Sequence, residues 1–159
     1  NNTFQHRFPL EYFSNFEFLG SKMESQLDIA FVIDTTGSMG SCIEQVKQNV
    51  KKIVSDISTL VSCNNIRCSV IGYKDHCDPE VVKVHCEFTS NMNTVQSAVN
   101  QLYPSGGGDF PEAVTDGLFH VPRLDWRPNA VKTVVLIGDA PPHGCGASGD
   151  SYPDGCPCK

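Results

Sequence analysis

Hydrophobic residues along the chain form short continuous runs and helical repeats, and the two patterns alternate. Residues 28–33 read DIAFVI, a run of β-branched and aromatic side chains that is typical of a strand buried on both faces. Apolar residues at spacings of three and four follow this run and predict a helix over about residues 41–62. A second continuous run, VKTVVLI at residues 131–137, predicts another doubly buried strand.

The middle of the chain changes from continuous runs to strict alternation. Apolar and polar side chains alternate over residues 66–70 and again over residues 82–88, with a short polar loop between the two segments. Such a pair predicts two antiparallel strands at the edge of a sheet. Two shorter helices are expected, one over about residues 95–102 and one that begins near Pro111, after the turn SGGGD.

The order strand, helix, strand, strand, helix, helix, strand predicts an α/β fold with a doubly wound, mostly parallel sheet and one antiparallel edge strand. Residues 1–26 hold no sustained period and are expected to be an irregular lead-in to a domain at residues 27–144, with a disordered linker as the alternative. Residues 145–159 form a Cys-, Gly- and Pro-rich loop. A doubly wound sheet normally continues past this point, so the last strands and helices of the fold are expected to be missing.

Composition narrows the classes of protein that this chain can represent. Among 159 residues, 40% are hydrophobic and 19% are charged, which is enough apolar material for a packed core. The net charge of −6 argues against a nucleic-acid partner, because such a surface needs basic residues to replace counterions. The sequence has no apolar run of about 18 residues, so no membrane insertion is expected.

Polar oxygens follow two of the predicted strands at their carboxyl ends. In open α/β sheets the binding crevice lies outside these ends. Carboxylates and hydroxyls without thiolates or imidazoles suit Mg²⁺ better than Zn²⁺, with Mn²⁺ or Ca²⁺ as alternatives. The sequence therefore predicts a metal site made of Asp34, Thr36, Ser38, Asp109 and Asp139.

A helix cap is the alternative explanation of the turn after the first strand. Asp, Thr and Ser side chains commonly accept hydrogen bonds from the free backbone N–H groups at the start of a helix. The full string D-x-T-G-S-M-G and the two further acids, at positions where the fold brings strand ends and loops together, favour the metal site.

Three motifs, DIAFVIDTTGSMG, GGGDFPEAV and VVLIGDAPPHG, resemble a von Willebrand factor A domain with its metal-ion-dependent adhesion site. The resemblance covers about residues 27–144. The segment Tyr73-Lys74-Asp75-His76 and the GGGD turn are closest to intracellular eukaryotic A domains, including those found beside atypical alpha-kinases. The resemblance implies that Mg²⁺ is coordinated by Asp34, Thr36 and Ser38 from the first motif, Asp109 from the second and Asp139 from the third.

A metal-dependent protein-binding module is the function that the resemblance implies, with Mg²⁺ joining the domain to an oxygen donor of a protein partner. The alternative is a regulatory or targeting domain of a larger intracellular protein, such as an alpha-kinase, in which the metal is mainly structural. A Mg²⁺-dependent hydrolase is a third hypothesis. Catalysis by this chain is not expected, because the sequence holds no P-loop lysine and no G-x-S-x-G nucleophile turn.

The eight cysteines leave the redox compartment open. Cys68 and Cys86 lie at apolar positions of the two alternating strands and are expected to be buried free thiols. The likeness to intracellular domains favours a cytoplasmic location, and an extracellular one is the alternative. A second cluster, near the C-terminus, is a candidate zinc or disulfide site, with a loop of free thiols as the simpler interpretation; it consists of His143, Cys145, Cys156 and Cys158.

Overall fold

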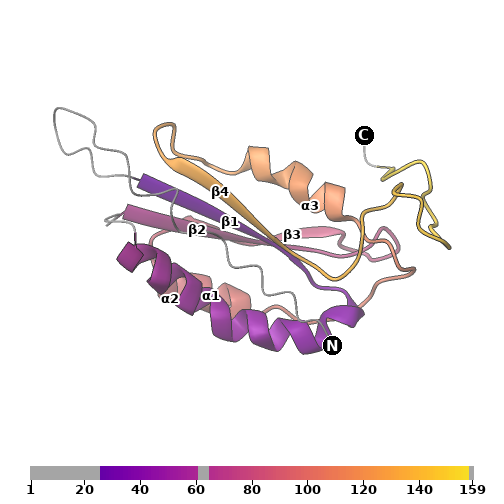
Figure 1. The fold of residues 1–159 in the computed structure, drawn as a ribbon, viewed down its shortest axis with the longest axis horizontal. Helices are drawn as coiled ribbons and strands as arrows, with labels where there is room; N and C mark the ends of the chain where they lie inside the picture. Colours follow the sequence, from indigo (N-terminus) through magenta and orange to yellow (C-terminus); the bar gives the residue numbers. More distant parts are fainter. Residues whose placement is uncertain (1–25, 61–64, 158–159) are drawn as a thin grey trace.

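The sheet places its four strands in the order β3–β2–β1–β4 (Figure 1). The computed structural model describes residues 26–60 and 65–157. β1 pairs in parallel with β2 and with β4, whereas β3 pairs antiparallel with β2 at the edge. The predicted α/β class, the mostly parallel sheet and the antiparallel edge strand are therefore confirmed. The strands are β1 (Gln26–Asp34), β2 (Asn65–Tyr73), β3 (Val82–Thr89) and β4 (Val131–Ile137).

Helices cover both faces of the sheet, with α1 and α2 on one side and α3 on the other (Figure 1). The predicted helices over 41–62 and 95–102 correspond to α1 and α2. Residues 1–25 of the predicted lead-in and the expected end of the first helix lie outside the described residues. No helix in the described part of the chain is long and apolar enough to cross a membrane. The helices are α1 (Gly40–Leu60), α2 (Met92–Asn100) and α3 (Val114–His120), with short 3₁₀ turns at η2 (Gly37–Met39) and η3 (Val121–Arg123).

Alternate residues of β1 divide between two apolar cores, because successive side chains of a strand point to opposite faces. Ile29, Phe31 and Ile33 pack in the core that α1 and α2 share with the sheet. Ala30 and Val32 pack in the smaller core on the α3 side. β1 is thus buried on both faces, as its continuous apolar run predicted.

β4 differs from its prediction, since one of its faces is open. Val134 and Leu136 are 42% and 46% exposed, whereas Val135 and Ile137 pack against the core on the α1 side. The expectation of a doubly buried strand was wrong because β4 lies at the sheet edge. The helix on that face, α3, packs against β1 and β2 instead.

α3 begins at Val114, three residues later than the position of Pro111 predicted. The backbone before it is extended and forms an isolated parallel bridge between Glu112 and Pro142. Glu112 N donates to Pro141 O at 2.9 Å, and Glu112 O accepts from His143 N at 3.3 Å. These tertiary hydrogen bonds replace the first helical turn and hold Glu112 beside the segment that follows β4.

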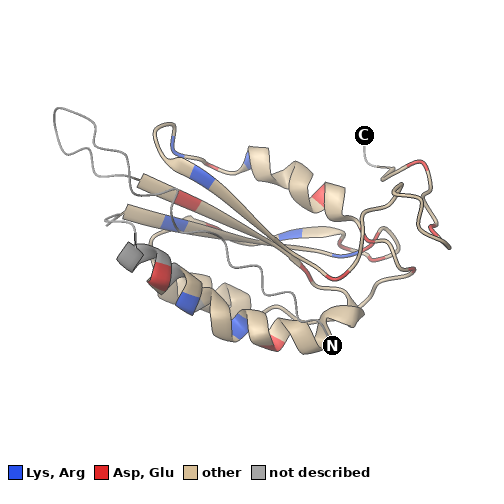
Figure 2. Cartoon of the chain, in the orientation of Figure 1, with Lys and Arg blue, Asp and Glu red and all other residues tan. Residues whose placement is uncertain are grey.

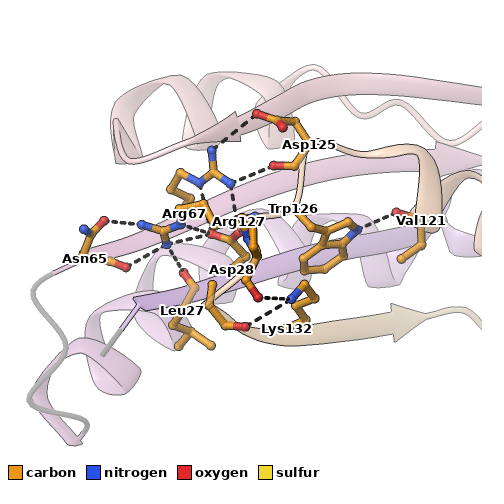
Figure 3. Close-up of polar contacts among 11 residues, drawn as sticks. Leu27, Asp28, Asn65, Arg67, Val121, Asp125, Trp126, Arg127 and Lys132 are labelled. Carbon is orange, nitrogen blue, oxygen red and sulfur yellow. Dashed lines mark hydrogen bonds and ion pairs between the residues drawn. The ribbon is translucent and has the colours of Figure 1, made fainter. Parts of the chain in front are cut away.

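Asp28 anchors the opposite end of the sheet through two arginines (Figure 3). Its buried carboxylate accepts from Arg67 Nη2 at 2.9 Å and from Arg127 Nε at 2.9 Å. Arg127 also donates to Leu27 O and to Asn65 O, so it joins the starts of β1 and β2. Burial by itself would raise the pKa of Asp28, but the hydrogen bonds from both arginines lower it to about 2.

Candidate metal centre

Four of the predicted oxygen ligands lie along one chain of hydrogen bonds. Asp34, the last residue of β1, accepts from Thr36 N at 2.8 Å and from Thr36 Oγ1 at 2.6 Å, both through Oδ1. Thr36 Oγ1 lies 3.2 Å from Ser38 Oγ, which donates to Asp139 Oδ1 at 3.0 Å. The turn after β1 and the turn after β4 therefore bring these side chains together at one edge of the sheet.

A helix cap does not account for this turn. Thr36 occupies the N-cap position of η2, and its side chain makes no capping hydrogen bond. Its hydroxyl donates to Asp34 instead, and Ser38 turns toward Asp139 rather than toward the backbone of α1. The oxygens are thus arranged around one another, as in a site that gathers donors for a cation.

Two buried carboxylate oxygens at this place have no hydrogen-bond partner, Asp34 Oδ2 and Glu112 Oε2. Burial raises the pKa of Asp34, opposed by the hydrogen bonds from Thr36. Burial and the nearby charges of Asp34 and Asp75 raise the pKa of Glu112 to about 8. A buried carboxylate without a partner is costly, and a bound cation would offset that cost. The donor set fits a hard divalent ion such as Mg²⁺.

The glycine-rich loop before Asp109 is fixed against the turn after β1. Gly37 N donates to Gly106 O at 3.1 Å, and Ser105 N donates to Thr35 O at 3.0 Å. Gly106 has a φ of 75°, and a Cβ there would lie 1.8 Å from Asp78 Oδ1, so only glycine fits. These two hydrogen bonds hold the loop that contains Asp109 at the same edge of the sheet as the turn after β1.

Asp109 itself lies in a neighbouring cluster. Its Oδ2 accepts from Ser151 N at 2.6 Å. One of its carboxylate oxygens lies within 4.8 Å of ligand atoms of both Asp75 and His143. The chain of hydrogen bonds from Asp34 to Asp139 does not include it. The structure therefore brings together Asp34, Thr36, Ser38 and Asp139. The Asp109 carboxylate lies in the neighbouring cluster instead, where its Oδ1 is a buried atom without a hydrogen-bond partner.

His143 is the centre of that neighbouring cluster. Its Nε2 lies 2.7 Å from Asp75 Oδ1, and its Nδ1 lies 2.8 Å from Asp150 Oδ1. Burial would lower the pKa of His143, but the two carboxylates raise it. Burial would raise the pKa of Asp75, but the hydrogen bond with His143 lowers it. His143 thus bridges the loop after β2 and the C-terminal loop.

The profile of the von Willebrand factor A domain matches residues 28–142. The chain belongs to the von Willebrand factor A domain family. A similar sequence is the alpha-protein kinase vwkA of Dictyostelium discoideum, which is 35% identical over 136 residues. That match covers 82% of this chain and 21% of the kinase, so the chain spans about a fifth of its relative.

Solved structures share the fold at lower identity. The vWF domain of a type V pilus tip protein from Porphyromonas gingivalis has a TM-score of 0.59 and 16% identity, and the match covers 79% of this chain and 43% of that one. Proximal thread matrix protein 1 of the mussel byssus has a TM-score of 0.52 and 24% identity, covering 73% and 29% of the two chains. Identities this low support the architecture alone.

Acidic residues of this A domain are concentrated in the loops at the end of the sheet where β1 and β4 finish (Figure 2). Lys74 is a basic residue within this acidic region, and it contacts the turn after β1. Its Nζ donates to Thr35 O at 2.8 Å and also to Ser105. The lysine stabilises the loops by hydrogen-bonding to oxygens of Thr35 and Ser105. It forms no salt bridge with the carboxylates of Asp34 and Asp139.

Glu112 of the A domain is the site residue that sequence reasoning missed. Its position two residues before α3 resembled an ordinary first helical turn, so no role was assigned to it. Its side chain is buried, and Asp34 and Asp75 are the nearby charges that raise its pKa. In sequence, Glu112 is an acid between a proline and the apolar pair Ala113-Val114, a pattern that is common for a solvent-facing side chain at the start of a helix. The pattern therefore did not indicate that Glu112 is buried.

The predicted zinc or disulfide cluster of the A domain is not assembled by the described residues. Both ring nitrogens of His143 face carboxylates, and Cys145 is exposed. Cys156 Sγ lies 2.6 Å from Thr115 Oγ1, and Cys158 lies outside the described residues. Cys68 and Cys86 are free and buried as predicted.

Proposed function

We propose that this A domain binds a protein partner through a Mg²⁺ ion held where β1 and β4 end. The observation that carries the proposal is the buried Asp34 carboxylate, whose Oδ2 has no partner while its Oδ1 begins a chain of hydrogen bonds that ends at Asp139. Hydroxyl and carboxylate oxygens in this number match the ligands that Mg²⁺ takes in proteins.

Asp34, Thr36, Ser38 and Asp139 would hold the ion, with Glu112 as a further acid from a third segment. The sequence assigned that last position to Asp109. Both acids have one buried carboxylate oxygen without a partner. Glu112 is the better candidate, because its carboxylate lies near Asp34 and hydrogen-bonds with the proposed ligand Thr36, whereas Asp109 accepts from Ser151 N in the C-terminal loop. When bound, Mg²⁺ supplies an electrophilic position for an oxygen atom of the partner.

The charge of the site indicates what kind of oxygen the partner offers. Asp34 and Asp139 contribute −2, which balances the charge of the ion, and an ionised Glu112 makes the site negative. A further carboxylate from the partner would then be repelled. A neutral donor, such as a hydroxyl or an amide oxygen, is the preferred group.

A regulatory or targeting role within a larger intracellular protein is the second candidate function. It is favoured by the similarity to the alpha-protein kinase vwkA, of which this chain matches 21%. In that case the ion stabilises the domain, and the partner binds elsewhere on it. Both functions are non-catalytic, and both are consistent with a cytoplasmic location.

Thermal unfolding with and without Mg²⁺ tests the metal site. A ligand that binds only the folded state raises the melting temperature, and Asp34→Ala should abolish the increase. Asp125→Ala is the control, because this side chain is 95% exposed and remote from the turn after β1. An equal increase in Asp34→Ala would refute the site. Capture of a protein partner with and without a chelator then separates the two functions.

A further inference from the structure

Three segments far apart in sequence place one metal-ligating side chain each at a common point, away from the proposed Mg²⁺ site. His76 lies in the loop after β2, Asp116 lies in α3, and Cys156 lies in the C-terminal loop. One ligand atom of each residue lies within 4.8 Å of the other two. His76 Nε2 is 3.3 Å from Asp116 Oδ2.

The imidazole and the carboxylate of this cluster are buried, and each has one atom without a hydrogen-bond partner. The side chains of His76 and Asp116 are 4% and 8% exposed. His76 Nε2 and Asp116 Oδ2 are both buried atoms that make no hydrogen bond. The two atoms are close enough to form an ion pair when the imidazole is protonated. With a neutral imidazole they cost free energy unless a further group satisfies both of them.

We propose that His76 Nε2, Asp116 Oδ2 and Cys156 Sγ bind a Zn²⁺ ion. A nitrogen, an oxygen and a sulfur donor form the mixed set that zinc accepts and that Mg²⁺ does not. Three protein ligands leave one tetrahedral position for water or for another donor. Of the four residues that the sequence suggested for zinc, Cys156 belongs to this site, whereas Cys158 lies outside the described residues.

The charges of the three ligands balance the ion. Zn²⁺ bound by a neutral imidazole, one carboxylate and one thiolate gives a site with no net charge. Burial and the adjacent Asp116 carboxylate raise the pKa of Cys156 to about 11, so its sulfur carries a proton when no metal is bound. Zinc binding therefore releases that proton to solvent as the sulfur–zinc bond forms.

A Cys–His–Asp catalytic triad is the alternative use of these residues, and the geometry argues against it. In a triad the acid and the nucleophile contact opposite nitrogens of the histidine. Here the acid faces Nε2, and the sulfur hydrogen-bonds to Thr115 and to Asp116. All three donors thus converge on one point. A protonated thiol is also a poor nucleophile.

The proposed zinc would attach the C-terminal loop to the rest of the domain. Residues 140–157 contain no helix or strand, and the ring of Tyr152 packs at 4.9 Å against that of His76. Zinc would add a link from this loop to α3 and to the loop after β2. Structural zinc sites stabilise small, loop-rich segments in the same way.

Cobalt substitution tests the site spectroscopically. The reduced, chelator-stripped chain is titrated with Co²⁺ in excess Mg²⁺, so that the hard-oxygen site is already occupied. We expect one equivalent of Co²⁺ to give the near-ultraviolet charge-transfer band of a thiolate–cobalt bond and tetrahedral visible bands. Cys156→Ser should lose the charge-transfer band, and Cys145→Ser, which removes an exposed thiol of the same loop, should keep it.

Two further variants keep the test decisive if the cysteine variant folds poorly. Asp116→Asn retains every thiol and should weaken Zn²⁺ binding at least tenfold in competition with a chromophoric chelator, with an unchanged circular dichroism spectrum. Asp34→Ala should leave Zn²⁺ binding intact, which separates this site from the Mg²⁺ proposal. A thiolate–cobalt band that persists in Cys156→Ser, no stoichiometric binding, or unchanged Zn²⁺ affinity in Asp116→Asn would overturn the assignment.

Discussion

Ser38 Oγ donates a hydrogen bond to Asp139 Oδ1 at 3.0 Å, although the two residues are 101 positions apart in the chain. The contact exists because β1 and β4 are parallel neighbours, so that both strands end at the same edge of the sheet. Ser38 comes four residues after the last residue of β1 and Asp139 two residues after the last residue of β4, so the two turns bring a hydroxyl and a carboxylate together. The topology of the sheet, rather than local sequence, assembles the proposed site.

Ser38→Ala should separate metal binding from stability. Ser38 is exposed, so removing its hydroxyl should change the free energy of unfolding without Mg²⁺ by no more than about 0.5 kcal/mol. The same change removes a proposed ligand and should weaken Mg²⁺ binding measured by calorimetry. Ser41→Ala, at an exposed position in the first turn of α1, is the matched control and should bind Mg²⁺ normally. Equal Mg²⁺ affinity in the two variants would contradict the assignment of Ser38.

Glu112→Gln should act in opposite directions on the metal-free and metal-bound protein. Without Mg²⁺, the variant replaces a buried carboxylate whose pKa is raised to about 8, so the melting temperature at pH 8 or above should rise. With Mg²⁺, the loss of an anionic ligand should weaken binding about tenfold or more, since one ligand charge at short range is worth at least 1.4 kcal/mol.

Asp109→Asn distinguishes the two acids that compete for the third segment of the site. Because Asp109 groups with Asp75 and His143, this variant should weaken Mg²⁺ binding less than Glu112→Gln does. Calorimetry on both variants decides the order. If Asp109→Asn has the larger effect, the ligand predicted from the sequence is correct and the role proposed for Glu112 is wrong.

Asp28 should make the domain acid-labile in a defined pH window. Its pKa is about 2 in the folded protein and 3.8 when unfolded, so ionised Asp28 stabilises the folded state above about pH 4. That contribution, about 2 kcal/mol, is lost as the pH falls from about 4 to 2. Urea unfolding as a function of pH measures it.

Asp28→Asn provides the control for this window. The variant should cost about 3 kcal/mol at pH 7, because it leaves Arg67 and Arg127 without their buried counter-charge. Its stability should change less than that of the parent between pH 4 and 2. A parallel pH profile in the two proteins would show that other carboxylates cause the acid sensitivity.

The free cysteines should react with iodoacetamide at very different rates in the folded protein. Cys145 is exposed and should be modified first, whereas Cys68 is buried and burial raises the pKa of its thiol to about 12. Mass spectrometry of peptides after a short pulse at pH 8 gives the order. Similar rates for Cys68 and Cys145 would mean that the β2 core opens on the timescale of labelling.

Much of the fold follows from short-range pattern. β1 was predicted because a strand buried on both faces leaves a continuous apolar run in the sequence. α1 was predicted because a helix buried on one face leaves apolar residues at spacings of three and four. The open face of β4 was not predicted, since an apolar run cannot show whether a neighbouring helix covers it. The late start of α3 depends on the hydrogen bond from Glu112 N to Pro141 O, a tertiary contact that local propensity does not encode.

The ligand positions of the candidate site at strand ends were predictable from the sequence, whereas those in loops were not. Asp34 and Asp139 follow paired strands, so their proximity could be inferred from topology alone. The positions of Asp109 and Glu112 depend on how the glycine-rich loop turns between Gly106 and the start of α3. The partners of Cys156 were missed because His76 and Asp116 come from segments that only the folded chain brings to the C-terminal loop.

Anomalous diffraction from crystals grown with Mn²⁺ tests the central claim most directly, since Mn²⁺ prefers the same oxygen ligands as Mg²⁺. The account predicts one strong anomalous peak within bonding distance of Asp34 Oδ2, close to Ser38 and Asp139. A peak in the cluster of Asp75, Asp109 and His143 alone, or none near Asp34 in Mn²⁺-saturated crystals, would contradict it.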